Sequence, residues 1–141
     1  MNSAPNYNVS RACHTIAPGE AEGPPLVSAD DICFYLCDPS TGQVIEEGHA
    51  LYGLSVANKV LVFPGGKGSS VVQTDGLYQL ALHHNAPAAL VIENPDTVLV
   101  ASCIILEIPL VDRVDAAFYQ DVHAGMPLKV EANQGRIRYD I

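Results

Sequence analysis

Two runs of consecutive apolar residues occupy the middle of the chain, at 60–63 and 88–92. Runs of this length without polar alternation are typical of strands that are buried on both faces of a sheet. Between them lie a glycine-rich loop and residues 75–84, in which Leu77 and Leu80 recur at helical spacing. The pattern predicts a strand, a loop, a helix and a second strand, with parallel strands and the loop at their carboxyl edge.

On either side of this unit the apolar runs are shorter and are separated by turn residues. Residues 32–37 and 43–46 flank an Asp-Pro-Ser-Thr-Gly turn, in which Pro39 presets φ and Gly42 accepts a positive φ. This pattern predicts two strands joined by the turn. A closing hairpin is also expected, because residues 128–132 alternate apolar and polar and an Asn-Gln-Gly turn follows them.

The remaining segments complete the predicted fold. Residues 97–103 are expected to form a helix and residues 104–111 a strand, in which Pro109 favours an edge position or a strand start. Residues 1–12 are polar and without period, which predicts a flexible N-terminal arm before one folded domain at 13–141. Together the elements predict an α/β fold with a mixed sheet or a partly closed barrel.

Composition and charge exclude several classes of function. The 141 residues are 48% hydrophobic, which is enough for one ordinary core. The chain has 16 acidic and 7 basic residues, and its net charge of −9 disfavours nucleic acid and anionic lipid as partners. No stretch approaches the roughly 20 apolar residues that cross a bilayer, and no signal-peptide pattern is present. We therefore expect a cytoplasmic protein with free thiols and with no nucleic-acid or membrane partner.

The sequence Pro-Gly-Gly-Lys-Gly-Ser-Ser at residues 64–70 is the strongest candidate for a functional site. Its glycines allow backbone amides to face a ligand, and the start of the following helix favours an anion there. The lysine precedes the last glycine, so the spacing is not that of a nucleotide-binding Walker loop. Two interpretations stay open. In the first, backbone amides and Lys67 lower the pKa of a serine hydroxyl enough for the ionised serine to act as a base. In the second, Ser69 or Ser70 only caps the helix.

Other chemically capable residues have simpler explanations. Cys33 and Cys37 would lie roughly 13 Å apart on a strand and are interpreted as buried small residues rather than metal ligands. The two histidines at 83 and 84 would cap a helix end, where their imidazoles interact favourably with the helix dipole. Glu20 and Glu22 share one side of an extended segment, which suits either a cation or a solvated surface. No ligand spacing relates the other histidines, His14, His49 and His123.

Five motifs, taken in order, resemble the small subunit of aconitase X-type dehydratases over roughly residues 15–140. They are Gly-Glu-Ala-Glu-Gly at 19–23, Asp-Pro-Ser-Thr-Gly at 38–42, residues 60–70, Ala-Pro-Ala-Ala at 86–89 and Ile-Pro-Leu-Val-Asp at 108–112. The family implies a swivelling β/β/α domain that docks onto a large subunit, which holds an iron–sulfur cluster and most of the substrate pocket. The resemblance therefore implies a hydro-lyase that is complete only as a heteromer.

By the same resemblance, Ser69 is the base that abstracts a proton from a small hydroxy acid. Ser70 and the amides around Gly66 and Gly68 would hold a substrate carboxylate, and Lys67 stands where the family has Lys or Arg. Family members dehydrate either cis-3-hydroxy-L-proline or mevalonate 5-phosphate. The small share of charged residues, the four cysteines and the many Asn and Gln are unlike a hyperthermophile's composition, which favours hydroxyproline, with mevalonate 5-phosphate as the alternative.

Two further classes of function stay open. The glycine loop would also suit a non-catalytic domain that captures an anionic ligand or a peptide and works without a partner. A carrier domain related to phosphohistidine swivels would need a histidine on an exposed loop beside glycines, and none of the five histidines fits that requirement.

Overall fold

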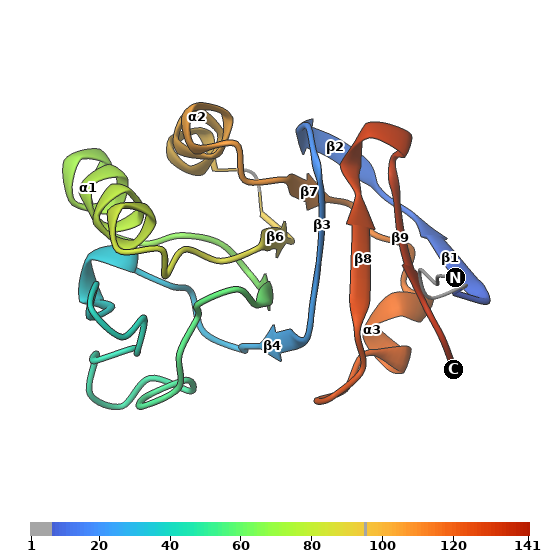
Figure 1. The fold of residues 1–141 in the computed structure, drawn as a ribbon, viewed down its shortest axis with the longest axis horizontal. Coiled ribbons are helices and arrows are strands. Elements are labelled where there is room, and N and C mark those ends of the chain that lie inside the picture. The colour runs from blue at the N-terminus through green and yellow to red at the C-terminus, as the bar shows by residue number, and fades with distance from the viewer. Residues whose placement is uncertain (1–6, 95) are drawn as a thin grey trace.

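The computed structural model describes residues 7–94 and 96–141 and arranges them in three layers (Figure 1). A four-stranded antiparallel sheet packs on a five-stranded mixed sheet, and helices α1 and α2 cover the other face of the mixed sheet. The helices are α1 (Ser70–Leu82), α2 (Thr97–Leu106) and α3 (Ala117–Asp121). The strands are β1 (Val9–Ala12), β2 (His14–Ala17), β3 (Glu20–Gly23), β4 (Pro25–Val27), β5 (Val60–Phe63), β6 (Ala89–Ile92), β7 (Leu110–Asp112), β8 (Leu128–Glu131) and β9 (Arg136–Tyr139).

The mixed sheet has the order β2-β7-β6-β5-β4. Strands β4 to β7 run parallel, and β2 runs antiparallel to β7. The predicted strand, loop, helix and strand are confirmed, because β5 and β6 pair in parallel, with Val60 opposite Ala89, and α1 connects them. The helix is longer than its apolar spacing predicted. It begins at Ser70 rather than at residue 75, directly after the N-cap Ser69.

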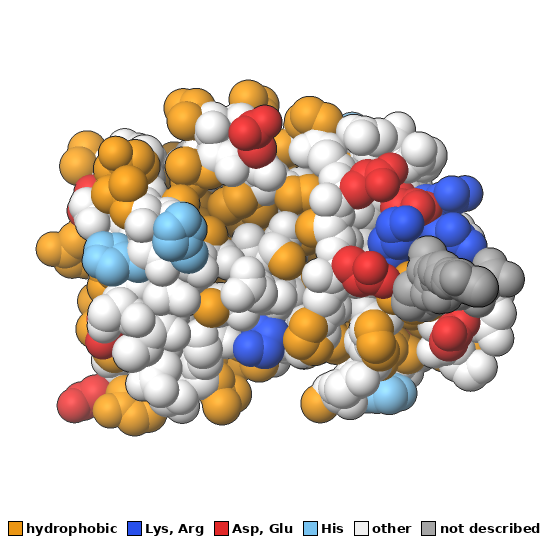
Figure 2. Space-filling view, in the orientation of Figure 1, with side chains coloured by type: hydrophobic (Ala, Val, Ile, Leu, Met, Phe, Trp, Pro, Cys, Tyr) orange, Lys and Arg blue, Asp and Glu red, His pale blue; other side chains and the backbone are white. Residues whose placement is uncertain are grey.

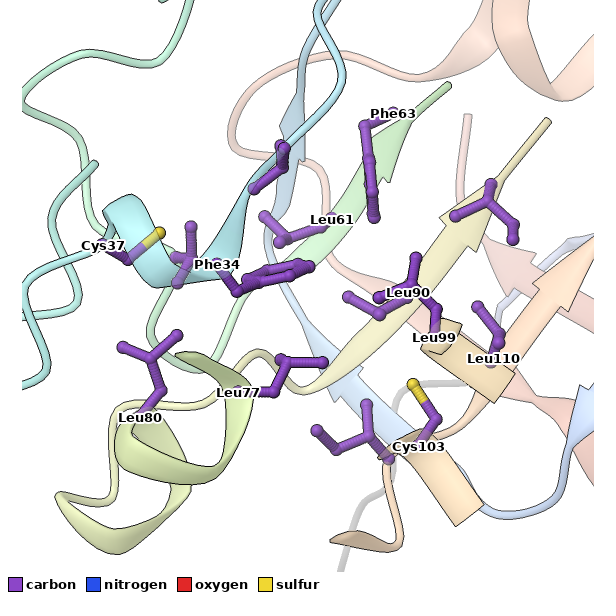
Figure 3. Close-up of a cluster of buried hydrophobic side chains, with 14 of the residues drawn as sticks. Phe34, Cys37, Leu61, Phe63, Leu77, Leu80, Leu90, Leu99, Cys103 and Leu110 are labelled. Atoms are coloured by element: carbon purple, nitrogen blue, oxygen red, sulfur yellow. The ribbon is translucent and has the colours of Figure 1, made fainter. Parts of the chain in front are cut away.

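The two central strands are buried on both faces, as their continuous apolar sequences predicted. Val60 and Val62 of β5 point toward the antiparallel sheet and pack in the core between the two sheets. Leu61 and Phe63 point the other way, toward α1, α2 and the segment that contains Phe34 (Figure 3). The period of two within one strand therefore supplies two separate cores.

The antiparallel sheet has the order β1-β9-β8-β3 and includes the predicted C-terminal hairpin. Gly135 turns the chain between β8 and β9 with a φ of 66°. The prediction of a flexible arm at residues 1–12 is wrong for Val9–Ala12, because this segment forms β1 and pairs with β9. The edge of β9 satisfies the backbone groups of β1, and Arg11 also binds Asp121 at 2.7 Å, so a polar segment is ordered. Residues 1–6 of that arm lie outside the described residues.

Two predicted strands take another form. Residues 32–37 contain a 3-10 turn at Phe34–Leu36 instead of a strand, and the Phe34 N–H donates to the side chain of Gln73 in α1. Only Cys37 keeps the expected pairing across the turn, as an isolated bridge to Val44. The predicted strand at 104–111 is shorter, since α2 continues to Leu106 and β7 begins directly after Pro109.

None of the helices within residues 7–94 and 96–141 is long and apolar enough to cross a membrane.

Candidate active site

The glycine loop lies at the carboxyl edge of the mixed sheet, where β5 ends and α1 begins. Helix α2 starts at the same edge, after β6, with Asp96 as its N-cap. Because β5 and β6 are parallel, both helices direct their amino-terminal ends toward this edge. Two partial positive charges therefore meet beside the loop, which favours an anionic ligand there.

Hydrogen bonds from neighbouring segments fix the first half of the loop. The Lys67 N–H donates to the Ile32 carbonyl at 3.2 Å, and the Gly66 N–H donates to Asp96 Oδ2 at 3.1 Å. A Cβ on Gly66 would come within 2.4 Å of Gln73 Nε2 and 2.6 Å of Asp96 Oδ2. The amides of residues 66 and 67 are thus occupied within the chain, and Gly66 shapes the loop by admitting these two side chains.

The second half of the loop faces solvent. Ser69 has extended backbone angles and its Oγ accepts a hydrogen bond from the Val72 N–H at 3.4 Å, so Ser69 caps α1. Capping uses Oγ only as an acceptor, which leaves its proton free. Within the described part of the chain, the N–H groups of Gly68, Ser69, Ser70 and Val71 meet no acceptor. Four open amides therefore lie in the same short segment as the exposed Ser69.

Gly68 is the point at which the loop requires glycine. Its φ of +103° lies in the region that other residues rarely adopt, and an added Cβ would approach Cys33 Sγ to 3.1 Å. The tight turn at this position directs the following serines away from the core. Cys33 is buried directly beneath the turn and supports it from below.

Lys67 is held by a carboxylate that comes from a distant part of the sequence. Its Nζ lies 2.5 Å from Glu46 Oε2, and both side chains are partly exposed. The hydrogen bond to Glu46, with a smaller contribution from the charge of Asp30, raises the pKa of Lys67, so the ammonium group stays charged. A substrate anion would have to replace Glu46 as its partner.

Three residues that shape this site were missed from the sequence: Glu46, Gln73 and Asp96. Gln73 is buried, donates to the Ile32 carbonyl at 3.0 Å and accepts from the Phe34 N–H at 2.6 Å. Two sequence features could have indicated these residues: Gln73 falls in the apolar inward stripe of α1, and Asp96 stands directly before a helix start, where a capping residue is expected. Nothing local marks Glu46, because only the tertiary structure brings it to Lys67.

The cysteines do not offer a ligand set for the iron–sulfur cluster that the resemblance implies. Burial raises the pKa of Cys37 and Cys103 to about 12 and that of Cys13 to about 11, which disfavours the thiolates that such clusters require. No group of three His, Cys, Asp or Glu side chains suited to a metal occurs among residues 7–94 and 96–141. The residues described here do not fit the cluster.

Two histidines, His83 and His49, have structural partners. His83 ends α1 and its Nδ1 lies 2.9 Å from the Gln79 carbonyl, as the capping interpretation predicted. His49 is buried. Its Nδ1 accepts from the Leu51 N–H at 2.9 Å, which leaves Nε2 to donate to the Asp31 carbonyl at 2.8 Å. These two imidazoles serve the fold.

Two further contacts join residues that are distant in the sequence. His14, on the edge strand β2, places Nδ1 2.8 Å from Oδ1 of the buried Asp112. Glu22 accepts a hydrogen bond from the Tyr7 phenol, whereas Glu20 is exposed. Neither carboxylate of the 19–23 motif contacts the glycine loop, so that motif contributes to the antiparallel sheet rather than to the site.

Comparisons with known proteins agree with one another. Residues 10–139 match the model of the aconitase X swivel domain. The chain is 38% identical over 128 residues to the phosphomevalonate dehydratase small subunit of Methanothermobacter thermautotrophicus, covering 90% of this chain and 97% of that protein. The protein of the same name from Methanocella arvoryzae is 43% identical over 125 residues, which cover 88% of this chain and 94% of that protein.

A solved structure shows the same fold. A chain from the crystal structure of Thermococcus kodakaraensis aconitase X in its holo-form superposes with a TM-score of 0.83 and 34% sequence identity. The match covers 94% of this chain and 98% of that chain.

Proposed function

The chain belongs to the aconitase X swivel-domain family as the small subunit of a dehydratase, and we propose that its substrate is mevalonate 5-phosphate. The relatives carry this proposal, because proteins 38% and 43% identical to the chain, over nearly its whole length, are named phosphomevalonate dehydratase small subunits. Composition favoured hydroxyproline instead. Composition reports on growth temperature and solvation rather than on the groups that a pocket contacts, so we give the relatives more weight.

Ser69 is proposed as the general base. The carboxylate of the substrate acidifies the adjacent C–H bond, and Ser69 Oγ takes that proton. The C–H electron pair then forms the new double bond as the C–O bond on the next carbon breaks, and the leaving hydroxide takes a proton from solvent and departs as water. A serine alkoxide is normally too basic to form near neutrality. The amino-terminal end of α1 and the open amides stabilise its negative charge and so favour its formation. The cap does not use the proton of the exposed Ser69 hydroxyl, so Oγ can lose that proton to solvent and then act as the base, which supports this assignment.

The open amides are proposed to hold a substrate carboxylate or phosphate. The N–H groups of Gly68, Ser69 and Ser70 lie at the amino-terminal end of α1, where an anion is favoured. Ser70 is exposed beside them. Lys67 adds a positive charge once it leaves Glu46. Gly66 belongs to the site by shaping the loop, because its own amide is already bound to Asp96.

The rest of the enzyme is assigned to the large subunit, which the small-subunit name implies. The family's iron–sulfur cluster is proposed to belong to that partner, because the described residues of this chain do not fit it. No step of the proposed reaction is assigned to a metal on this chain. The complex is proposed to work in the cytoplasm, where the four free cysteines stay reduced.

The test is turnover by the chain co-expressed anaerobically with its large subunit. We expect dehydration of mevalonate 5-phosphate and none of cis-3-hydroxy-L-proline. Turnover of hydroxyproline alone would overturn the substrate assignment and leave the family assignment intact. An intact complex that dehydrates neither compound, with a small subunit that binds an anion alone, would favour the non-catalytic binding domain.

Glu46→Gln is expected to lower the KM for mevalonate 5-phosphate about two- to fivefold with little change in kcat. The reason is that a partly exposed ion pair is worth about 0–1 kcal/mol, and the substrate no longer has to break it to reach Lys67. The matched control is Glu47→Gln, a change at the exposed neighbouring residue. A raised KM together with a lowered kcat would show instead that Glu46 positions Lys67 for the substrate.

A further inference from the structure

Helix α2 is apolar on every side. Its sequence, Thr-Val-Leu-Val-Ala-Ser-Cys-Ile-Ile-Leu, contains no charged residue, yet only Leu99, Ser102 and Cys103 are buried. Ile104 is half-exposed and Ile105 is 76% exposed. A helix that is hydrophobic all round is normally covered all round, and here the mixed sheet and α1 leave one side of α2 exposed.

Helix α1 has a second apolar stripe of its own. Its inward stripe is buried against the sheet, while Val71, Tyr78 and Leu82 lie one or more turns apart on the outward side. Val71 is 78% exposed, the highest value among the exposed large hydrophobic residues. Asp75 is the sole charged residue in the whole helix, although the chain carries a net charge of −9.

The exposed stripe of α1 and Ile105 of α2 form one surface, which we call the α1–α2 face and define as Val71, Tyr78, Leu82 and Ile105. A groove between the helices is lined by Thr74, Tyr78, Ser102, Ile105 and Leu106. Figure 2 shows hydrophobic side chains gathered over the two helices, whereas the charged side chains cluster over the antiparallel sheet. An apolar surface of this kind, adjoining a site that is incomplete, is typical of a protein interface.

The face runs directly into the candidate active site. A second hollow, lined by Ser70, Val71, Thr74, Asp75 and Tyr78, connects the groove with the start of α1. A protein that approaches Ser69 closely enough to complete the site must therefore lie against Val71. A second copy of this chain on the same face would instead close over the serine loop.

We propose that the α1–α2 face is the surface on which the large subunit docks, through an uncharged, apolar surface of its own. The proposal rests on the proposed function, because that function supplies the partner and the need to complete the site around Ser69. Docking would cover the exposed side of α2 next to α1 and remove Ile105 from water. It would also exclude water from the serine loop, where a dry site strengthens each hydrogen bond to the substrate.

The test is the affinity of the small subunit for the purified large subunit, measured by calorimetry without substrate. We expect Ile105→Glu and Tyr78→Glu each to weaken binding at least tenfold, because a carboxylate would have to be buried without a partner. The matched control is Ile141→Glu, because Ile141 is 70% exposed and lies beyond β9, away from α1 and α2 (Figure 1). Unchanged melting temperatures of the isolated variants would show that they still fold.

Each outcome separates docking from catalysis. Wild-type affinity in both variants would overturn the docking proposal and leave the assignment of Ser69 intact. Dissociation of a small-subunit dimer by Ile105→Glu, with large-subunit binding unchanged, would also overturn it and assign the face to a second copy. An intact complex that fails to dehydrate mevalonate 5-phosphate would count against the proposed function alone, since binding is measured without turnover.

Discussion

Ser69→Ala is expected to lower kcat for mevalonate 5-phosphate about 10³-fold in the intact complex, with KM changed less than about threefold. The substitution removes the atom that takes the proton and leaves the open amides in place, because those belong to the backbone. Loss of the cap costs about 1 kcal/mol, which lowers stability without unfolding a domain of this size. Steady-state kinetics of the complex, with its integrity checked by gel filtration, measures the effect.

Ser69→Asn separates the base from the cap. Asparagine caps a helix about as well as serine, so the melting temperature is expected to return close to that of the wild type. It has no hydroxyl, so turnover is expected to stay as low as in Ser69→Ala. Turnover that recovers together with the cap would assign Ser69 a structural role, and the proposed mechanism would then be wrong.

Gly76→Ala is expected to destabilise the small subunit by about 3 kcal/mol or more, which lowers its melting temperature by roughly 10 °C. Alanine gains about 1 kcal/mol of helix propensity over glycine in a helix interior. Against this gain, the added Cβ would lie 2.3 Å from the backbone N of Tyr35 and 2.4 Å from the backbone C of Phe34. Backbone atoms cannot rotate aside, so α1 and the 3-10 turn must separate, and the steric cost wins.

The measurement is thermal unfolding of the isolated small subunit, followed by circular dichroism. Gly65→Ala is the matched control, because the nearest atom to its added Cβ is 3.7 Å away and its φ is not positive. We expect that control to stay within about 1 kcal/mol of the wild type. A melting temperature of Gly76→Ala within two or three degrees of the wild type would show that the turn can move away from the helix at little cost.

The strongest sequence patterns predicted the centre of the fold correctly. The apolar runs at β5 and β6 and the hairpin of β8 and β9 form as expected, because each is specified by residues close together in the chain. The glycine loop also lies where the strand pattern placed it, at the carboxyl edge of the sheet. The roles of its serines stay a prediction, and the site geometry is consistent with them.

The N-terminal segment and residues 32–37 were predicted less well. Val9–Ala12 is polar enough to read as an arm, and it becomes a strand only because the open edge of β9 accepts it. Phe34 resembles a strand residue by sequence, yet the side chain of Gln73 binds its N–H and Gly76 lets the turn lie against α1. Glycine inside a predicted helix was the one available signal of such close packing.

Local pattern therefore determined which segments become the central strands, where the helices lie between them and which loop presents the serines. Tertiary packing alone decided which amides of that loop remain open, since Asp96 and Ile32 occupy two of them from other segments. It also decided the partner of Lys67 and the exposure of one side of α2. The physical reason is that periodicity reports burial and direction within a segment, whereas hydrogen bonds and ion pairs between segments depend on how those segments meet in space.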